Sequence, residues 1–495
     1  MAPSSRPCIV WFRDDLRLSD NPALHFAATR GTPTICVYVF DEESAPLRAP
    51  SWRPLGGAAR WWLAQSLRCL QSDLAGRGAT LLLRKGPAAA VIARLAEDVG
   101  ADTVTWNDIA MQPHRRIGND LVGALDRLGI PSRIFPGDLL AAPESIRNKD
   151  GRALRVFTPF WKRLLATAPA APLPAPAALL PADVPDGGRL EDRHLEPTHP
   201  DWAGGLRETW TPGEASAQAM LAGFLDTRIH GYADNRDRPD LDGTSRLSPH
   251  LGFGEIGPRQ VWHAAHFAAH RRPEIARDID KFLSELGWRE FCRHLLLDEP
   301  EIAARNLQSS FDGFPWRDDQ AALRQWQSGL TGYPIVDAGM RQLWHTGTMH
   351  NRVRMVAASF LVKHLLIDWR DGESWFWDTL VDADPGSNPA NWQWVAGSGA
   401  DAAPYFRIFN PVLQGEKFDP DGDYVRAHVP ELARVPAAYI HKPWRAPANV
   451  LAAAGVTLGR TYPEPIVDHA VARQMALDAF AAMRRAAAAT ERQAG

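Results

Sequence analysis

The segment Lys281–Leu296 places a carboxylate, an indole and a guanidinium at helical spacing. Four of its residues lie at positions i, i+3, i+4 and i+7 and so share one helix face: Glu285, Trp288, Arg289 and Cys292. A carboxylate that accepts hydrogen bonds and a ring that stacks suit a nucleobase. The pattern favours the floor of a base-binding pocket, and an ordinary solvated helix face is the alternative.

A second candidate is the segment Gly243–His250, which reads GTSRLSPH. Ser248 is a good N-cap and Pro249 a good first helical residue, so free backbone N–H groups should converge there with three hydroxyl groups. A helix start of this kind suits a phosphate. An ordinary capped helix is the alternative.

Cationic and amide donors cluster in Met349–Met355, MHNRVRM, at the beginning of an otherwise apolar helical stretch. The helix dipole disfavours arginine at this end, so Arg352 and Arg354 require an anionic partner. A phosphate of DNA or of a flavin nucleotide would serve, and so would an acidic neighbour within the protein.

The thirteen residues from Asp382 to Trp394 hold acidic, amide and indole side chains beside turn-forming Pro and Gly, and Gly397–Pro411 follows. This composition predicts a loop shaped around a ligand. A capped turn packed by tryptophan is the alternative.

The whole chain has the composition of a globular protein. Its 495 residues are 45% hydrophobic and 23% charged, enough for several domains. There is no run of about 18 apolar residues and no secretory signal, so we expect a cytoplasmic protein without a membrane span. The four cysteines lie far apart, with no metal-binding spacing, and we expect no metal. A net charge of −3 argues against a uniformly basic nucleic-acid binder but permits a local basic face.

The first 135 residues alternate short apolar runs with helix-period stretches. This alternation predicts βαβ units and a parallel, Rossmann-like sheet. No GxGxxG follows the first run, which argues against a dinucleotide dehydrogenase. The predicted strands are Ile9–Phe12, Ile35–Phe40, Thr80–Leu83, Val104–Trp106 and Ser132–Phe135.

Beyond the sheet, residues 168–188 are rich in Pro and Ala and indicate a semi-rigid linker. Apolar residues then recur at spacings of three and four between Gly and Pro breaks, which predicts a helical domain. An Ala-rich, peripheral helix is expected at Arg473–Ala488. We therefore expect an α/β domain at 1–135, a linker at 136–205 and a helical domain at 206–495.

Several long segments together resemble the photolyase/cryptochrome family. They are IVWFRDDLRLSDNPAL, GTSRLSPHLGFGEI, ELGWREFCRHLL, MHNRVRMVAASFLVKHLLIDWR and SNPANWQWVAGSGADAAPYFRIFNPVLQGEKFDPDGDYV. The resemblance covers almost the whole chain and is greatest to class I cyclobutane pyrimidine dimer photolyases. It implies a fold of class α/β plus all-α, with an antenna domain, a linker and a helical domain that binds FAD.

The resemblance implies a carbon–carbon lyase that repairs cyclobutane pyrimidine dimers in DNA by electron transfer from photoexcited, reduced FAD. The expected partner is DNA that contains pyrimidine dimers, bound by a monomer without an obligate protein partner. A second, antenna chromophore is also expected. The loop Trp106–Pro113 lacks the glutamate expected beside a folate, so the antenna remains open among folate, deazaflavin, another flavin and none.

Three other functions remain as alternatives. A cryptochrome-type blue-light photoreceptor of the plant type would be expected to carry aspartate where this chain has Asn388, and a (6-4) photolyase would be expected to place histidine where it has Met355. An electron-transfer flavoprotein without DNA binding would leave the basic residues without a role.

The resemblance also assigns residues. It places at FAD Tyr232, Thr244, Ser245, Leu247, Ser248, Glu285, Arg289, Asn351, Arg354, Asp382, Asp384 and Asn388, with Asn388 facing flavin N5. It places at the flipped-out dimer Glu285, Trp288, Asn351, Met355 and Trp394, with Phe282 where many relatives have tryptophan. DNA phosphates are assigned to Arg236, Arg352, Arg407 and Lys417, and the photoreduction chain to Trp392, Trp369 and Trp316. Glu285, Asn388 and the three chain tryptophans are the residues expected to act in catalysis.

Overall fold

The computed structural model describes residues 6–49, 52–183, 187–402 and 406–494 of the chain, with side chains described up to residue 488. Contacts divide the chain into two compact units. Unit 1 comprises Met1–Ala203, Trp210–His230 and Ser245–Glu301, and unit 2 comprises Gly204–Thr209, Gly231–Thr244 and Ile302–Gly495. The sequence-based boundaries near residues 135 and 205 stay predictions.

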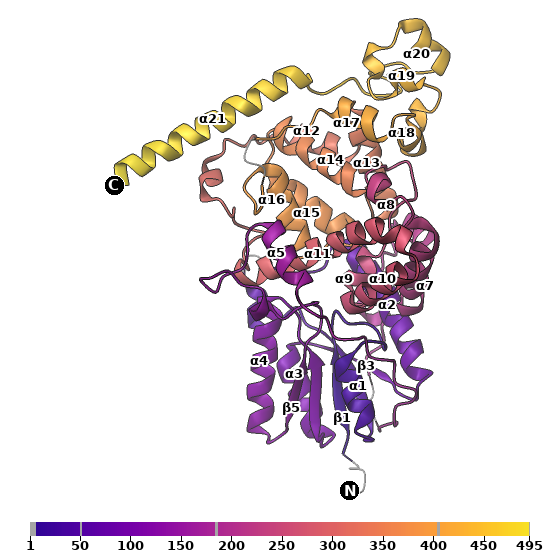
Figure 1. Cartoon of the computed structure of the whole chain (residues 1–495), viewed down its shortest axis with the longest axis vertical. Helices are drawn as coiled ribbons and strands as arrows, with labels where there is room; N and C mark the ends of the chain where they lie inside the picture. The colour runs from indigo at the N-terminus through magenta and orange to yellow at the C-terminus, as the bar shows by residue number, and fades with distance from the viewer. Residues whose placement is uncertain (1–5, 50–51, 184–186, 403–405, 495) are drawn as a thin grey trace. The chain divides into compact units, whose positions relative to one another are not determined.

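Unit 1 contains a five-stranded parallel sheet, as predicted, with strand order β3-β2-β1-β4-β5 (Figure 1). Apolar runs become strands here because a parallel sheet is covered on both faces. In register, Ile9 on β1 lies between Ile35 on β2 and Val104 on β4, and all three are fully buried. The strands are β1 (Cys8–Phe12), β2 (Thr34–Phe40), β3 (Leu81–Lys85), β4 (Thr103–Asn107) and β5 (Ser132–Phe135).

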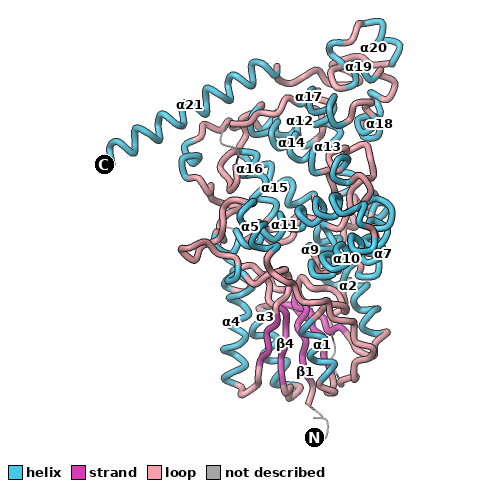
Figure 2. Tube along the Cα trace, viewed as in Figure 1, coloured by secondary structure: helices cyan, strands magenta, loops and turns pink. Residues whose placement is uncertain are grey.

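The helices of unit 1 fall into two groups according to their place relative to the sheet. Figure 2 shows the strands gathered in one region, with helices of the first group beside them. Those within the sheet region are α1 (Pro22–Thr29), α2 (Gly57–Ala75), α3 (Ala88–Asp98) and α4 (Gln112–Arg127). Those that follow the sheet are α5 (Phe157–Leu165), α7 (Glu214–Gly223), α9 (Ser248–Gly252), α10 (Pro258–Arg271) and α11 (Ala276–Asp298), with a π-helical turn at Phe224–Arg228.

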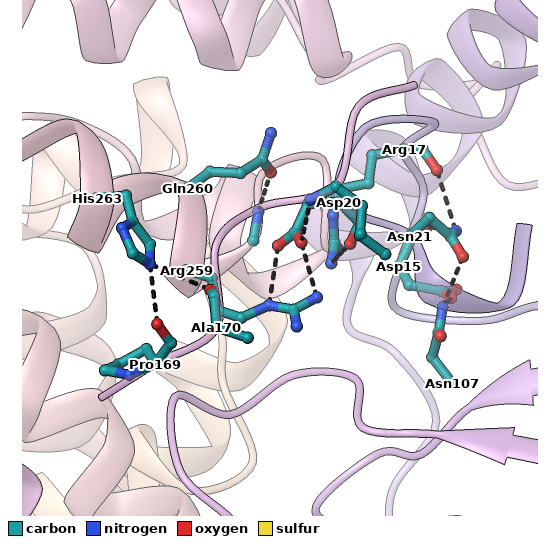
Figure 3. A network of polar contacts seen from close by, with 12 residues as sticks. Asp15, Arg17, Asp20, Asn21, Asn107, Pro169, Ala170, Arg259, Gln260 and His263 are labelled. Carbon is teal, nitrogen blue, oxygen red and sulfur yellow. Dashed lines mark hydrogen bonds and ion pairs between the residues drawn. The ribbon is translucent and has the colours of Figure 1, made fainter. Parts of the chain in front are cut away.

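The strand order reverses between β1 and β4, where doubly wound sheets commonly bind ligands at the carboxyl ends of their strands. In this chain a buried polar network lies at those ends (Figure 3). Asn107, the last residue of β4, donates through Nδ2 to Asp15 Oδ2 at 2.6 Å and to Asn21 Oδ1 at 2.7 Å. The protein's own side chains therefore satisfy one another at this position.

The same network ties the β1–α1 loop to the linker and to α10. Asp20, fully buried, accepts from Arg259 Nη2 at 2.7 Å, and its backbone N–H donates to the Leu173 carbonyl at 2.7 Å (Figure 3). His263 on α10 lies 3.0 Å from the Pro169 carbonyl through Nε2. A buried carboxylate is costly without a charged partner, so the Asp20–Arg259 pair is expected to persist. Together with the Leu173 and Pro169 contacts, it fastens α10 and part of the linker to the loop that follows β1.

Unit 2 is helical, as predicted. Its core contains Trp326, Trp369, Phe360 and Phe376, all nearly fully buried. The helices are α6 (Gly204–Thr209), α8 (Tyr232–Asn235), α12 (Gln320–Gln327), α13 (Pro334–Thr346), α14 (Asn351–Lys363), α15 (Trp369–Thr379), α16 (Ser387–Ala396), α17 (Pro411–Phe418), α18 (Asp423–His428), α19 (Ala437–Ile440), α20 (Ala448–Ala454) and α21 (His469–Ala494). In the ranges described, no helix is long and apolar enough to cross a membrane.

The C-terminal helix is longer than the predicted Arg473–Ala488 and begins at His469. One face of α21 is buried, because Ala476 and Met483 pack with Phe311 and Phe314 in a small aromatic cluster. Val471 and Met475, on the same helix, are exposed.

Candidate active site

The predicted face of α11 exists, and the structure adds a partner to each of its polar side chains. Glu285 forms an ion pair with Lys281, one turn earlier on the same helix, at 2.8 Å. Arg289 donates through Nη1 to the Asp138 carbonyl at 2.9 Å and to Glu290 at 3.0 Å. Glu285 and Arg289 are half-buried. The face is therefore neither core nor fully solvated.

Trp288 lies on this face with one side of its indole covered. The ring of Phe157, the first residue of α5, stacks on it with centroids 3.8 Å apart and planes 5° apart. Trp288 is nevertheless only half-buried. Phe282, by contrast, is 5% exposed and packs against Phe224, so it belongs to the core of unit 1.

Buried charge lies directly behind this face. Glu290 is fully buried and accepts from the Leu140 backbone N–H at 2.7 Å. Burial raises the pKa of Glu290 to about 7, although Arg289 opposes the shift. Burial likewise lowers the pKa of His294 to about 4, which keeps this imidazole neutral.

The structure differs from the prediction at Ser248. The N-cap residue of α9 is Leu247, and Ser248 is the first residue of a helix only five residues long. Arg246 adopts a left-handed conformation with φ of 56°, so the chain turns before Leu247 and not at Ser248. The predicted capping role of Ser248 is therefore wrong, while its role at a phosphate stays a prediction.

The hydroxyl residues before α9 are distributed over both units. Ser245 belongs to unit 1, and its Oγ accepts from the Leu247 backbone N–H at 3.4 Å. Tyr232 and Thr244 belong to unit 2, where Tyr232 is buried and Thr244 half-buried.

In unit 2, the two arginines at the beginning of α14 have acidic partners within the protein. Arg354 Nη2 lies 3.0 and 3.1 Å from the carboxylate oxygens of Asp382, and its Nε donates to the Met349 carbonyl at 2.7 Å. Arg352 Nη2 lies 2.5 Å from Asp237 Oδ2. The sequence left open whether these arginines pair with a phosphate or with an acidic residue of the protein. The structure has an acidic partner for each of them.

Neighbouring groups complete the arrangement at the start of α14. The Arg352 guanidinium carbon lies 4.3 Å from the ring centroid of Phe418, and Arg236 lies 3.8 Å from Asp237. His350 is the N-cap, and its Nδ1 accepts from the Arg352 backbone N–H at 3.2 Å. Burial lowers the pKa of His350 to about 4, so it is neutral and able to accept this bond.

The loop before α16 is ordered by its own polar residues. Asp384 Oδ1 accepts from the backbone N–H groups of Gly386 and Ser387 at 2.9 and 2.7 Å. Asn388 donates through Nδ2 to the carboxylate of Glu373 at 2.8 Å and to its carbonyl at 3.1 Å. Because both amide hydrogens of Asn388 are used on Glu373, its Oδ1 is the atom left to accept from a ligand.

The three tryptophans assigned to the photoreduction chain differ in burial. Trp369 and Trp392 are 0% and 2% exposed, whereas Trp316 is only partly buried. Trp392 packs on Phe376 with ring centroids 5.0 Å apart, and Trp369 Nε1 donates to Asn306 Oδ1 at 3.0 Å. Two of these rings thus lie in the core and one near the surface, and their assignment to photoreduction stays a prediction.

The remaining predicted residues lie toward the surface of unit 2. Trp394 donates through Nε1 to the Asp401 carbonyl at 3.0 Å, and the Arg407 guanidinium lies 5.8 Å from its ring centroid. Met355 is half-buried, and Asn351 begins α14 with an exposed side chain. Lys417 is exposed and lies 5.0 Å from the Phe418 ring centroid. Residues 403–405 of the predicted loop lie outside the described residues.

Several contacting residues were missed by the sequence analysis. Lys281 lies four residues before Glu285, so the i, i+4 rule for ion pairs would have found it. Asp237, Glu373 and Phe157 are far in sequence from their partners, and no local spacing indicates them.

Comparisons with known proteins show the family of this chain. Residues 8–177 match the family model described as DNA photolyase, and residues 282–482 match the FAD binding domain of DNA photolyase. A deoxyribodipyrimidine photo-lyase of Agrobacterium fabrum is 52% identical over 98% of this chain and 100% of its own length. The chain belongs to the photolyase/cryptochrome family. Its helical part therefore includes the family's FAD-binding domain.

Within this family, the identity to the Agrobacterium fabrum photo-lyase exceeds the identity to the cryptochromes. Cryptochrome-1 of Arabidopsis thaliana is 38% identical, over 94% of this chain and 69% of the cryptochrome. Among solved structures, a bacterial class III photolyase from Agrobacterium tumefaciens is 51% identical with a TM-score of 0.93, over 98% of this chain and 99% of that one. The chain is thus a photolyase homologue, but the expected closeness to class I is not supported.

A third relative bears on the antenna. An archaeal photolyase from Sulfolobus tokodaii is 29% identical with a TM-score of 0.78, over 96% of this chain and 99% of that one. Its structure contains two FAD molecules, which imply a novel light-harvesting cofactor in that protein. Second chromophores therefore occur among relatives of this chain.

Proposed function

We propose that this chain repairs cyclobutane pyrimidine dimers in DNA under light, as a photolyase of the class III branch. The observation that carries the proposal is the face of α11, on which a carboxylate, Glu285, stands one turn from the half-buried indole of Trp288. The 52% identity to a deoxyribodipyrimidine photo-lyase over the whole chain supports the same reading.

The residues present fit FAD by the chemistry of their donors and acceptors. Bound FAD, once reduced, supplies a single electron on excitation. In unit 1 we assign to FAD the residues Ser245, Leu247, Ser248, Glu285 and Arg289, and in unit 2 Tyr232, Thr244, Asn351, Arg354, Asp382, Asp384 and Asn388. Hydroxyl and backbone N–H groups suit its phosphates, and the Asp382–Arg354 pair and the Asn388 Oδ1 suit the polar edge of its ring.

At the lesion, Glu285 accepts hydrogen bonds from a base N–H, and Trp288 offers a stacking surface. Asn351, Met355 and Trp394 supply the further contacts. Met355 has no proton to give, whereas repair of a (6-4) photoproduct calls for an acid. This chain is therefore proposed to act on cyclobutane dimers and not on (6-4) products.

DNA phosphates are assigned to Arg236, Arg352, Arg407 and Lys417. Arg407 and Lys417 are exposed, which suits phosphate contacts that position the duplex without reading its sequence. Arg352 is already ion-paired with Asp237, so it contributes less to DNA binding than Arg407 does.

Photoreduction of FAD is assigned to Trp392, Trp369 and Trp316, because aromatic rings are the side chains that are most easily oxidised reversibly. The partly buried position of Trp316 supports its place as the last member. We further propose an antenna chromophore of open identity, and a monomer that acts in the cytoplasm without an obligate partner.

The experiment that tests this function illuminates the reduced holoprotein with an oligonucleotide that carries one thymine cyclobutane dimer. We expect restored thymines under light and none in the dark, and absence of light-dependent repair would contradict the proposal. Glu285→Ala should lower repair per absorbed photon more than lesion binding, because its hydrogen bond strengthens as charge develops on the dimer. Asp280→Ala, at an exposed acid on the same helix, is the matched control and should leave both unchanged.

A further inference from the structure

Helix α5 packs on α11 at a glycine, Gly287, where a larger residue would require Trp161 to move. A Cβ atom added to Gly287 would lie 2.5 Å from two ring carbons of Trp161 on α5, closer than any real Cβ contact. The indole of Trp161 therefore lies directly against the backbone of α11. This close approach fixes where α5 begins relative to the next residue of α11, Trp288.

The first residue of α5 occupies one face of Trp288. The rings of Phe157 and Trp288 are parallel within 5°, with centroids 3.8 Å apart. Phe291, one turn along α11, presents its edge to both rings, at 6.0 Å from Phe157 and 5.6 Å from Trp288. The edge-to-face contacts with Phe291 have a favourable aromatic geometry, whereas the parallel pair is closer than the centroid separation of about 4.5–7 Å that aromatic rings prefer. Between these two rings the indole has little freedom to rotate.

The stack continues behind Phe157. The Trp161 ring is parallel to the Phe157 ring within 10°, with centroids 6.1 Å apart. Phe157 and Trp288 are both only half-buried, unlike Phe160 of the same helix, which is 1% exposed and belongs to the core. Core packing alone accounts for Phe160, but it does not account for an aromatic pair held parallel at the surface of unit 1.

We propose that Phe157 is a positioning residue for lesion recognition, which holds the Trp288 indole in one orientation and covers one of its faces, so that a base stacks only on the other. Gly287 and Trp161 act with it by seating α5 on α11. This inference rests on the proposed lesion-stacking role of Trp288. A ring that is ordered before binding spares the complex the cost of ordering it, so the effect appears as lesion affinity.

The test is a double-mutant cycle on the FAD-loaded protein, with the dissociation constant for a thymine-dimer oligonucleotide measured in the dark. Trp288→Ala should weaken lesion binding by roughly tenfold or more, since it removes the stacking surface. Phe157→Ala should weaken it by a smaller factor, and the double variant should bind as Trp288→Ala does. Affinity for undamaged DNA and FAD content should stay at the parent values, although loss of the aromatic contacts should lower the thermal midpoint modestly. Phe157→Tyr should restore lesion affinity.

A second pair of variants tests the seat of α5. Gly287→Ala should reproduce the loss of lesion affinity expected for Phe157→Ala. The added methyl group displaces Trp161, and with it the position of α5 on α11. Gly223→Ala is its matched control, since a Cβ atom at Gly223, at the end of α7, meets no atom within 4 Å. Should Gly287→Ala fail to fold, the Phe157 cycle decides the matter by itself.

The outcomes separate the two proposals. Unchanged lesion affinity in Trp288→Ala would overturn the lesion-stacking role and this inference with it. A loss in Trp288→Ala without a loss in Phe157→Ala, or effects of the two changes that add in full, would overturn the positioning role alone. Equal losses of damaged and undamaged DNA in Phe157→Ala would mean a general structural role and would also overturn it.

Discussion

The ammonium group of Lys363 lies 3.7 Å from the ring centroid of Phe406 and donates to the carbonyl of Arg407 at 2.9 Å. Lys363 ends α14 and is 2% exposed. The buried amine of Lys363 thus contacts one aromatic face and donates one hydrogen bond to the backbone of a residue assigned to DNA.

This arrangement predicts how stability depends on pH. Burial, together with the smaller effect of the nearby Arg407 charge, lowers the pKa of Lys363 from 10.5 to about 7. Between these two values the unfolded chain binds more protons than the folded one, so the folded state gains stability as pH rises. The thermal midpoint of Lys363→Met should exceed that of the parent most at about pH 6, and this advantage should shrink toward about pH 10.

Lys442→Met is the matched control, because Lys442 is partly exposed and paired with Glu416 at 2.6 Å. The difference in thermal midpoint between Lys442→Met and the parent should be the same at about pH 6 and at about pH 10. A pH-independent difference between Lys363→Met and the parent would contradict a buried ammonium with a lowered pKa.

Asp382→Asn should weaken retention of FAD. The change keeps one oxygen but removes the charge that Arg354 contacts at 3.0 Å, in a side chain only 5% exposed. Loss of such a buried contact costs about 1–3 kcal/mol, or roughly a 5- to 150-fold rise in the FAD dissociation constant. Glu431→Gln removes a comparable partner from Arg341 and should leave FAD binding unchanged. Equal retention in both variants would remove Asp382 from the cofactor site.

Trp316→Phe should abolish light-driven reduction of oxidised FAD, since the partly buried last ring of the chain is removed. Repair by chemically reduced protein should survive, because the chain serves reduction and not the lesion. Trp202→Phe, at an exposed tryptophan of unit 1, should photoreduce normally. Normal photoreduction in both Trp316→Phe and Trp392→Phe would contradict the assignment of these rings to electron transfer.

DNA affinity should fall linearly with salt on a log–log plot, as expected for phosphate contacts. Arg407→Ala should flatten the slope by about one unit, because one phosphate contact is lost. Arg352→Ala should flatten it less, since Asp237 already offsets that charge. Arg127→Ala removes an exposed arginine from the last turn of α4 and should leave the slope unchanged. A full unit lost in Arg127→Ala would mean that the effect reflects net charge only.

The sheet was predictable because its information is local. Strands buried on both faces read as apolar runs, so the predicted Ile35–Phe40 is one residue short at its start and the predicted Val104–Trp106 is one residue short at each end. The i, i+3, i+4 spacing on α11 was equally local, and it placed Glu285 and Trp288 on the face where the structure has them.

What was not predictable depends on backbone conformation or on contacts remote in sequence. The left-handed φ of Arg246 moved the start of α9 and removed Ser248 from the N-cap. The partners of Asn388 and Trp288, Glu373 and Phe157, meet them only through tertiary packing. Spacing within one helix carries no information on such contacts.

The most direct test of the central claim compares two lesions in one illuminated reaction. The reduced holoprotein is given matched oligonucleotides, one with a thymine cyclobutane dimer and one with a (6-4) photoproduct, and the restored bases are counted per absorbed photon. With Glu285 and Trp288 on one face and Met355 in place of an acid, we predict light-dependent repair of the cyclobutane dimer and none of the (6-4) product. Repair of the (6-4) product, or no repair of either lesion, would contradict the account.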